Sequence, residues 1–311
     1  MKKETKIHNL LEDKISLILF SILSTMWGFT WLMGKYQVHN NILPEIAVSY
    51  RLLGVSILMF VILKFKKESF KLEKSDLKTL FIFAIFCTSI HLVCFYYAAK
   101  FMITSISALV FSFLVIFTAL IKYFLKLTPE RLTPIIISAV IGISGLLCIS
   151  SQMFYNVHIG VKLIVGMCFA FIATFFYSLG SVFYETKRSG LKIAQLPSFF
   201  YTSLFGAIIS FSLAIIHSLL SGEDVNLMPN ISISFIFSYL YLVVSGFGVL
   251  ITMILIQRIG AIQTSYTNFI TPVIAIFVSA IFEDYQILPT TIIGIILIIL
   301  SNYIAFFKRK A

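Results

Sequence analysis

Long apolar runs, separated by short polar breaks, follow one another along almost the whole chain. A helix that crosses the hydrocarbon layer of a membrane needs about 20 mostly apolar residues. The runs predict ten transmembrane helices, at residues 15–34, 45–63, 79–99, 104–125, 132–150, 163–184, 196–219, 233–256, 260–282 and 287–307. Transmembrane β-strands would alternate apolar and polar residues, and runs such as IIGIILIILSNYIAFF do not. We therefore expect an all-α polytopic membrane protein with almost no extramembrane domain.

The composition agrees with this pattern. Apolar residues make up 59% of the chain and charged residues 12%, and the mean hydropathy is +1.00, values typical of membrane proteins. The first apolar run is too long for the core of a cleavable signal peptide, and no small-residue cleavage site follows it, so we expect it to remain as a helix.

The cysteines predict no special chemistry. Cys87, Cys94, Cys148 and Cys168 all lie inside predicted helices, without a C-x-x-C pair or a histidine at metal-ligand spacing. We interpret them as small core residues. We expect no metal site and no cofactor.

The net charge of +11 is distributed in a way that indicates topology. Apart from Lys35, Arg51, Lys100 and Lys162, every lysine and arginine lies at a terminus, in an even-numbered connection between predicted helices or, as Lys122 does, in the last turn before one. With ten crossings, all of these segments lie on one side of the membrane, and the positive-inside rule makes that side cytoplasmic. The basic residues are therefore topological signals and contacts for anionic lipids, and we expect no nucleic-acid partner.

The two halves of the chain share a weak internal repeat. Residues 99–121 (AKFMITSISALVFSFLVIFTALI) and 257–279 (QRIGAIQTSYTNFITPVIAIFVS) both lead from a basic loop through a hydroxyl-rich start into an apolar helix. The following stretches, LTPERLTPIIISAVIG and FEDYQILPTTIIGIIL, each contain an acid, a proline and then a helix that carries a glycine. The order of these features predicts a first five-helix repeat at 15–150 and a second at 163–307.

A repeat of five helices is inverted relative to the membrane, because the number is odd. Inverted repeats are the architecture of alternating-access transporters, which bind substrate near the bilayer middle between the repeats. The remaining segments are then a cytoplasmic N-terminal segment (1–14), an outer connection (151–162) and a cytoplasmic tail (308–311).

Several motifs together resemble the EamA family of the drug/metabolite transporter superfamily. They are WGFTWLMGK, YRLLGVSILMF, FYYAAKFMITSISALV, PERLTPIIISAVIGISGLLCIS and ITPVIAIFVSAIFEDYQILPTTIIGIILIILSNYIAF, and they span residues 15–307. The resemblance implies a two-repeat metabolite exporter or permease and leaves the substrate open. One departure is that Pro272 of the ninth predicted helix has no counterpart in the FLVIFTA stretch of the fourth.

The ninth predicted helix has the most polar first half. Pro272 removes a backbone donor and is a candidate hinge. Asn268, one turn earlier, either bonds a neighbouring helix or faces a wet pathway. The hydroxyl-rich surroundings, which include Tyr266, favour the pathway.

The first helix carries both tryptophans. Trp31 lies near the outer boundary, where tryptophan is expected as an interfacial anchor. Trp27 should lie about 10 Å below that boundary, so we expect Trp27 and Thr30 to line a cavity rather than only to pack. Gly28 allows another helix to approach closely and is a second candidate for gating.

Ionisable and aromatic residues in other helices complete the candidate substrate site. His91 is either a neutral histidine bonded to a hydroxyl or carbonyl, or a proton carrier; Tyr97 lies towards the outer end of the same helix. Arg51 could snorkel outward, pair with Glu45, or contact an anionic group of the substrate. Tyr177 and Tyr241 are further candidates at comparable depth in the second half.

These residues favour a secondary transporter. No predicted helix centre contains Asp or Glu, so coupling would use His91, an end-located acid such as Glu185 or Glu283, or no ion at all. An intramembrane enzyme would need a nucleophile with a base, a zinc pair or paired acids, and no such constellation is present; a non-transporting sensor is a further alternative.

An aromatic cavity with neutral hydrogen-bonding groups suits a small amphipathic metabolite such as an amino acid, with a nucleoside-like compound as the alternative. The Lys-, Ile- and Asn-rich composition suggests the bacterial cytoplasmic (inner) membrane. A homodimer is compatible with the sequence, which does not determine the oligomeric state or the direction of transport.

Overall fold

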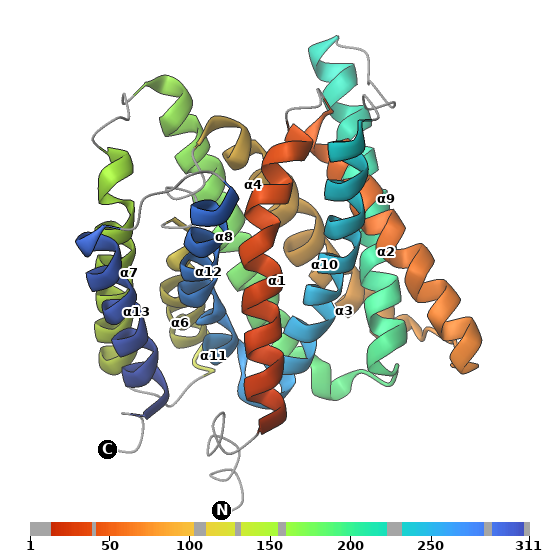
Figure 1. Cartoon of the computed structure of the whole chain (residues 1–311). Helices are drawn as coiled ribbons and strands as arrows, with labels where there is room; N and C mark the ends of the chain where they lie inside the picture. The colour runs from red at the N-terminus through yellow and green to blue at the C-terminus, as the bar shows by residue number, and fades with distance from the viewer. Residues whose placement is uncertain are drawn as a thin grey trace, which may run out of the picture.

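A computed structural model describes residues 14–38, 42–102, 110–127, 132–154, 160–222, 232–282 and 288–307 as a helical bundle (Figure 1). Its first half contains α1 (Lys14–Val38), α2 (Pro44–Lys66), α3 (Lys74–Phe83), the π-helical η2 (Ala84–Ile90), α4 (His91–Phe101), α6 (Leu114–Phe124) and α7 (Leu132–Phe154). Its second half contains α8 (Val161–Lys187), the short η3 (Arg188–Gly190), α9 (Gln195–Ser221), α10 (Ile233–Ile259), α11 (Ala261–Ser265), α12 (Thr267–Phe282) and α13 (Pro289–Phe307).

Over the residues that the structure describes, each predicted apolar segment is largely helical. The third is one continuous helix from Lys74 to Phe101, made of α3, η2 and α4. The ninth differs from the prediction, because it is divided at Tyr266 into the short α11 and the longer α12. The predicted N-terminal segment before Lys14, the tail after Phe307 and residues 155–159 of the outer connection lie outside the described residues.

Five helices are long and apolar enough to cross a membrane: Pro44–Lys66, Lys74–Phe101, Val161–Gly190, Gln195–Ser221 and Phe235–Ile259. Four further apolar stretches are shorter over the part that the structure describes: Lys14–Thr30, Val110–Phe124, Thr133–Ile149 and Pro289–Ile304. Large apolar side chains such as Phe65, Leu219 and Phe237 are exposed on the outer surface, as lipid contact requires. The chain is a multi-pass helical membrane protein, and the number of ten crossings remains a prediction.

The packing of the helices has a twofold pattern. Helices α2 and α9 pack on each other, as do α7 and α13. The pair α1 and α10 is matched by α8 and α4, and the pair α1 and α12 by α8 and α6. Exchange of the first five segments with the second five therefore reproduces the main contacts, which fits two structural repeats. The beginning of α1 and the end of α13 lie at the same end of the bundle (Figure 1), as an even number of crossings requires.

Glycines allow α7 and α13 to approach closely. A Cβ atom added at Gly145 would lie 2.7 Å from the carbonyl oxygen of Gly294, and one added at Gly294 would meet the carbonyl of Gly145. Small residues with this role are typical of membrane helix interfaces. Gly145 and Gly294 therefore lie in a small-residue packing seam between the fifth and tenth segments.

Candidate functional site

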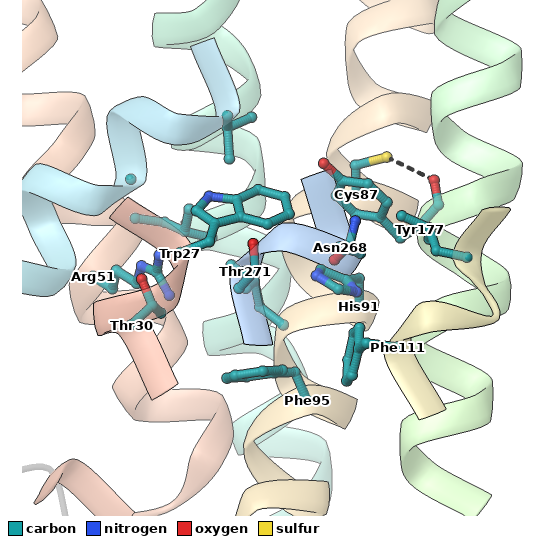
Figure 2. Close-up of a pocket in the computed structure, with 15 residues that line it drawn as sticks. Trp27, Thr30, Arg51, Cys87, His91, Phe95, Phe111, Tyr177, Asn268 and Thr271 are labelled. Carbon is teal, nitrogen blue, oxygen red and sulfur yellow. Dashed lines mark hydrogen bonds between the residues drawn. The ribbon is translucent and has the colours of Figure 1, made fainter. Parts of the chain in front are cut away.

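A pocket lies between helices of both halves of the chain (Figure 2). The space between the atoms that surround it amounts to about 720 Å³, a volume that includes the part open to solvent. Its lining residues are Trp27, Thr30, Arg51, Leu52, Cys87, His91, Leu92, Phe95, Phe111, Leu114, Tyr177, Gly246, Val249, Asn268 and Thr271. A pocket between two repeats has the location that inverted-repeat transporters use for substrate.

Arg51 brings a buried positive charge to one side of the pocket. Its side chain extends from α2 to α10, where Nε donates to the carbonyl oxygen of Leu242 at 3.0 Å and Nη2 donates to Oγ of Ser245 at 3.1 Å. Arg51 is only 4% exposed, and its Nη1 atom is buried without a hydrogen-bond partner. The sequence left three alternatives for Arg51. The structure shows neither outward snorkelling nor pairing with Glu45.

Aromatic rings form a continuous wall along the pocket. The Trp27 ring meets the Tyr177 ring edge-on at 5.8 Å, and the Tyr177 ring lies 4.6 Å from the His91 ring. His91 in turn lies 5.7 Å from Phe111, and Phe111 lies 5.4 Å from Phe95. Such edge and tilted contacts are the favourable geometries for aromatic pairs. The rings leave an apolar surface against which the body of a ligand can pack.

A local change in helix geometry positions His91. The π-helical η2 ends at Ile90, so the wider turn directly precedes His91 at the start of α4; such π segments are frequent at functional sites. Nδ1 of His91 lies 3.1 Å from the carbonyl oxygen of Ala173. Because a carbonyl only accepts, Nδ1 carries the proton in this bond. This contact corresponds to the neutral, carbonyl-bonded alternative for His91, and a proton-carrying role stays a prediction.

The break between α11 and α12 positions Asn268 in the pocket wall. The Asn268 amide donates to the carbonyl of Ser265 at 3.1 Å, and the Thr271 hydroxyl donates to the carbonyl of Thr267 at 2.9 Å. Pro272 lies inside α12 and has no N–H to donate to the carbonyl of Asn268, four residues earlier. The backbone carbonyl of Asn268, a residue that lines the pocket, thus lacks its usual donor within the helix.

A smaller pocket lies next to the first, towards α11, and the space between the atoms that surround it amounts to about 220 Å³, including the part open to solvent. The two spaces share Leu114, Tyr177 and Asn268, and the second adds the hydroxyl groups of Thr118, Ser181, Thr264, Ser265 and Thr267. Near Ala261, which also lines it, the ion pair between Lys122 and Glu185 has an N–O distance of 2.9 Å. Glu185 also accepts from the backbone N–H of Ala261 at 3.1 Å. Of the end-located acids, Glu185 is thus engaged here, whereas Glu283 lies outside the described residues.

The pocket therefore brings together six of the sequence-predicted candidates: Trp27, Thr30, Arg51, His91, Tyr177 and Asn268. Gly28 packs against the α12 backbone, because an added Cβ would lie 3.3 Å from the carbonyl oxygen of Thr271, next to Pro272. The side chain of Trp31 lies outside what the structure describes.

Four candidates lie elsewhere. Tyr97 and Glu45 bond each other at 2.8 Å. Tyr241 donates to the carbonyl of Met26, and Tyr266 bonds Ser138. A direct substrate contact for Tyr97, Tyr241 and Tyr266 stays a prediction, and these three residues do not line the pocket. Glu45 was a candidate as the ion-pair partner of Arg51.

Sequence reasoning did not select Cys87, Phe95 and Phe111 as pocket residues. Their side chains are indistinguishable by type from the many other small and apolar residues of the spans. Their place in the wall depends on the helix rotation that packing sets, and no local sequence signal encodes it.

Comparison with known proteins agrees with this picture. The EamA-like transporter family matches residues 14–151 and 164–307. The chain belongs to the EamA-like transporter family, part of the drug/metabolite transporter superfamily.

Two curated relatives are both named uncharacterized transporters. The one from Clostridium kluyveri is 25% identical over 266 residues, which cover 83% of this chain and 82% of that protein. The one from Buchnera aphidicola subsp. Schizaphis graminum is 24% identical over 307 residues, covering 95% and 97%. The family and these names indicate a membrane transporter of the drug/metabolite type rather than an enzyme.

A solved crystal structure has the same fold. It aligns with a TM-score of 0.72 at 13% sequence identity, covering 94% of this chain and 96% of that chain. At this identity the likeness concerns the fold alone.

Proposed function

We propose that this protein is a secondary transporter that moves a small amphipathic metabolite, such as an amino acid or a related compound, by alternating access. The observation that carries the proposal is the pocket itself, which is bounded by helices of both repeats and combines a buried cation with an aromatic wall. Substrate passes between two repeats that are oppositely oriented across ten crossings. The membrane is the bacterial cytoplasmic membrane, with both termini on the cytoplasmic side.

The crossing of α1 and α12 is the proposed moving part. Gly28 packs on the backbone of α12 at Thr271, and the next residue, Pro272, interrupts the helical hydrogen bonds. Rotation of α12 at this point would change the pocket wall at Asn268. We expect Pro272→Ala to slow transport while substrate affinity is retained; an unchanged transport rate would reject the hinge.

Flux through proteoliposomes tests the function. Purified protein is reconstituted and supplied with labelled amino acids, amines, nucleosides and sugar phosphates, with empty liposomes as the control. Saturable flux of an amino acid or related amphipathic compound supports the proposal. Flux of sugar phosphates alone rejects the substrate class, chemical turnover without flux indicates an enzyme, and binding without flux or turnover indicates a sensor.

A further inference from the structure

The guanidinium group of Arg51 is only partly satisfied by the protein. Two of its nitrogens are used, by the carbonyl of Leu242 and the hydroxyl of Ser245, and both acceptors are neutral. The third nitrogen, Nη1, is buried without a hydrogen-bond partner, and the residue as a whole is 4% exposed. A donor left without a partner in a buried site costs free energy, so the third nitrogen is available to a ligand that can accept from it.

The charge of Arg51 is also uncompensated. Within the described part of the chain, the ion pairs join Lys122 with Glu185, Lys192 with Glu73 and His217 with Glu45, and none includes Arg51. His91, Tyr96 and Tyr241 are among the ionisable groups on which the charge of Arg51 acts, and the Tyr96 hydroxyl is also close enough for a hydrogen bond with Arg51. A buried cation in a membrane segment is costly without an anionic partner. The missing partner can therefore be the substrate.

The remaining pocket limits what that partner can be. Among the described residues that line the pocket, Arg51 is the one arginine or lysine, and none is an aspartate or glutamate. One cation matches a group with a single negative charge better than a phosphate dianion. Figure 2 shows Arg51 and Thr30 together on one side, and His91 and Phe111 on the other. A molecule that spans the pocket would thus place its charged end at Arg51 and an apolar body against the rings.

We infer that Arg51 binds the carboxylate of the transported compound, which carries an aromatic or branched apolar body. Nη1 donates to one carboxylate oxygen, and charge-assisted bonds of this kind are shorter and stronger than neutral ones. The inference rests on the proposed function and specifies its substrate class. A carboxylate can belong to a simple organic acid or to an amino acid, whose ammonium group would find only neutral acceptors such as the Asn268 backbone carbonyl.

Binding of four matched probes tests the inference. They are 3-phenylpropanoate, its amide 3-phenylpropanamide, phenylalanine and 2-phenylethylamine, measured by titration calorimetry on the whole protein in nanodiscs. We expect the acid to bind about tenfold or more tightly than the amide, because the neutral amide leaves the cation unpaired, and the amine to bind most weakly. If phenylalanine binds as tightly as 3-phenylpropanoate, the carboxylate belongs to an amino acid. If phenylalanine binds much more weakly, the carboxylate belongs to a simple organic acid.

Variants locate the effect at Arg51. In Arg51→Gln the preference for acid over amide should disappear. Arg188→Gln is the matched control, because Arg188 also donates to a neutral side chain, Gln195, and to a backbone carbonyl, that of Ile193, but does not line the pocket; it should keep the preference. Ser245→Ala removes one bond that holds Arg51 and keeps the charge, so it should also keep the preference.

Several results would overturn the inference. The inference fails if the acid binds no more tightly than its amide to the unaltered protein, or if neither compound binds at millimolar concentration. It also fails if the Arg51→Gln variant folds and still prefers the acid. The comparison of acid with amide uses the unaltered protein, so it stands even if Arg51→Gln fails to fold. Proteoliposome flux of an amine or a neutral compound, with none of a carboxylate, would reject the carboxylate and leave the transporter function intact.

Discussion

Nδ1 of His217, near the end of α9, lies 3.1 Å from Oε1 of Glu45 at the start of α2. The same carboxylate oxygen accepts the hydroxyl of Tyr97 at 2.8 Å, and the second oxygen, Oε2, is buried without a partner. Glu45 is 5% exposed, and Tyr97 and His217 are half-buried, so the three residues connect α2, α4 and α9 around one buried carboxylate. This contact joins the two halves of the chain at one end of the bundle. The sequence did not single out His217.

The first prediction is that Glu45 and His217 act as a unit. Glu45→Gln and His217→Ala should each lower the stability of the protein, and the double variant should be less destabilised than the sum, with a coupling energy of about 0.5–3 kcal/mol. Unfolding in detergent monitored by circular dichroism measures this cycle. Ser212→Ala, on the exposed face of the same helix, is the control. Strictly additive effects would show that the contact contributes nothing.

The second prediction concerns Asp76, which joins the halves through a different loop. It is 1% exposed and accepts the backbone N–H of Ile193 at 2.9 Å and that of Lys192 at 3.3 Å. Asp76→Ala leaves these donors unsatisfied and should cost about 1–3 kcal/mol of unfolding free energy. A loss no larger than that of the control below would contradict the prediction.

The matched control is Glu73→Gln, which removes the exposed ion pair with Lys192. The hydrogen bond that Lys192 donates to the Glu73 carboxylate raises the pKa of Lys192. A raised pKa means that the pair contributes at neutral pH and is lost only as the pH rises through that raised value. Because exposed pairs contribute little, we expect the unfolding midpoint of Glu73→Gln to stay close to that of the unaltered protein at pH 7.

The third prediction tests the close contact of α7 and α13. Gly145→Ala places a Cβ atom 2.7 Å from the carbonyl of Gly294, and the forced separation should cost about 1–3 kcal/mol. Gly190→Ala is the control, because nothing lies within 4 Å of its added Cβ atom. Equal melting temperatures for the two variants would mean that the helices are not packed as described.

The fourth prediction concerns the aromatic wall. Trp27→Ala removes the ring that meets Tyr177, and 3-phenylpropanoate should then bind about tenfold more weakly, since an aromatic contact contributes about 0.5–1.5 kcal/mol beyond its buried area. Trp27→Phe should lose less. Phe237→Leu, on the exposed surface of α10, should leave binding unchanged. An unaltered affinity in Trp27→Ala would exclude this ring from the binding site.

The fifth prediction concerns topology. Cysteines placed at Gly190 and Gly222, which flank α9 and have open space around them, should lie on opposite sides of the membrane. In a protein without its native cysteines, an impermeant maleimide should label position 222 in intact cells and position 190 only after permeabilisation. Labelling of both from the same side would contradict the proposed orientation.

The helical segments of this protein were predictable, because their information is local. A run of about 20 apolar residues must form a helix in lipid, since each backbone polar group has to be satisfied inside the segment. The division of the ninth segment at Tyr266 was not predicted, although Gly260, with a φ of 89°, and Pro272 both lie close to it. How such residues bend a helix depends on the neighbours that replace the lost backbone bonds.

Residues of the candidate site were predictable only where a side chain is costly in free energy to place inside a membrane. Arg51, His91 and Asn268 are expensive to place inside a membrane, and their types alone made them candidates. Tyr97 and Tyr266 have a similar chemistry and lie outside the pocket, in contacts with Glu45 and Ser138. The depth of a residue in the membrane can be counted along the sequence. The direction in which its side chain points around the helix axis is set by the helices that pack against it.

The sequence by itself determined the helical membrane class, the approximate segments and the short list of costly polar residues, because these follow from the free energy of placing each residue in lipid. Only the tertiary structure decided that Arg51 bonds Leu242 and Ser245 rather than Glu45, and that Glu45 meets His217 instead. These pairs lie far apart along the chain, and the contact between them arises from helix packing.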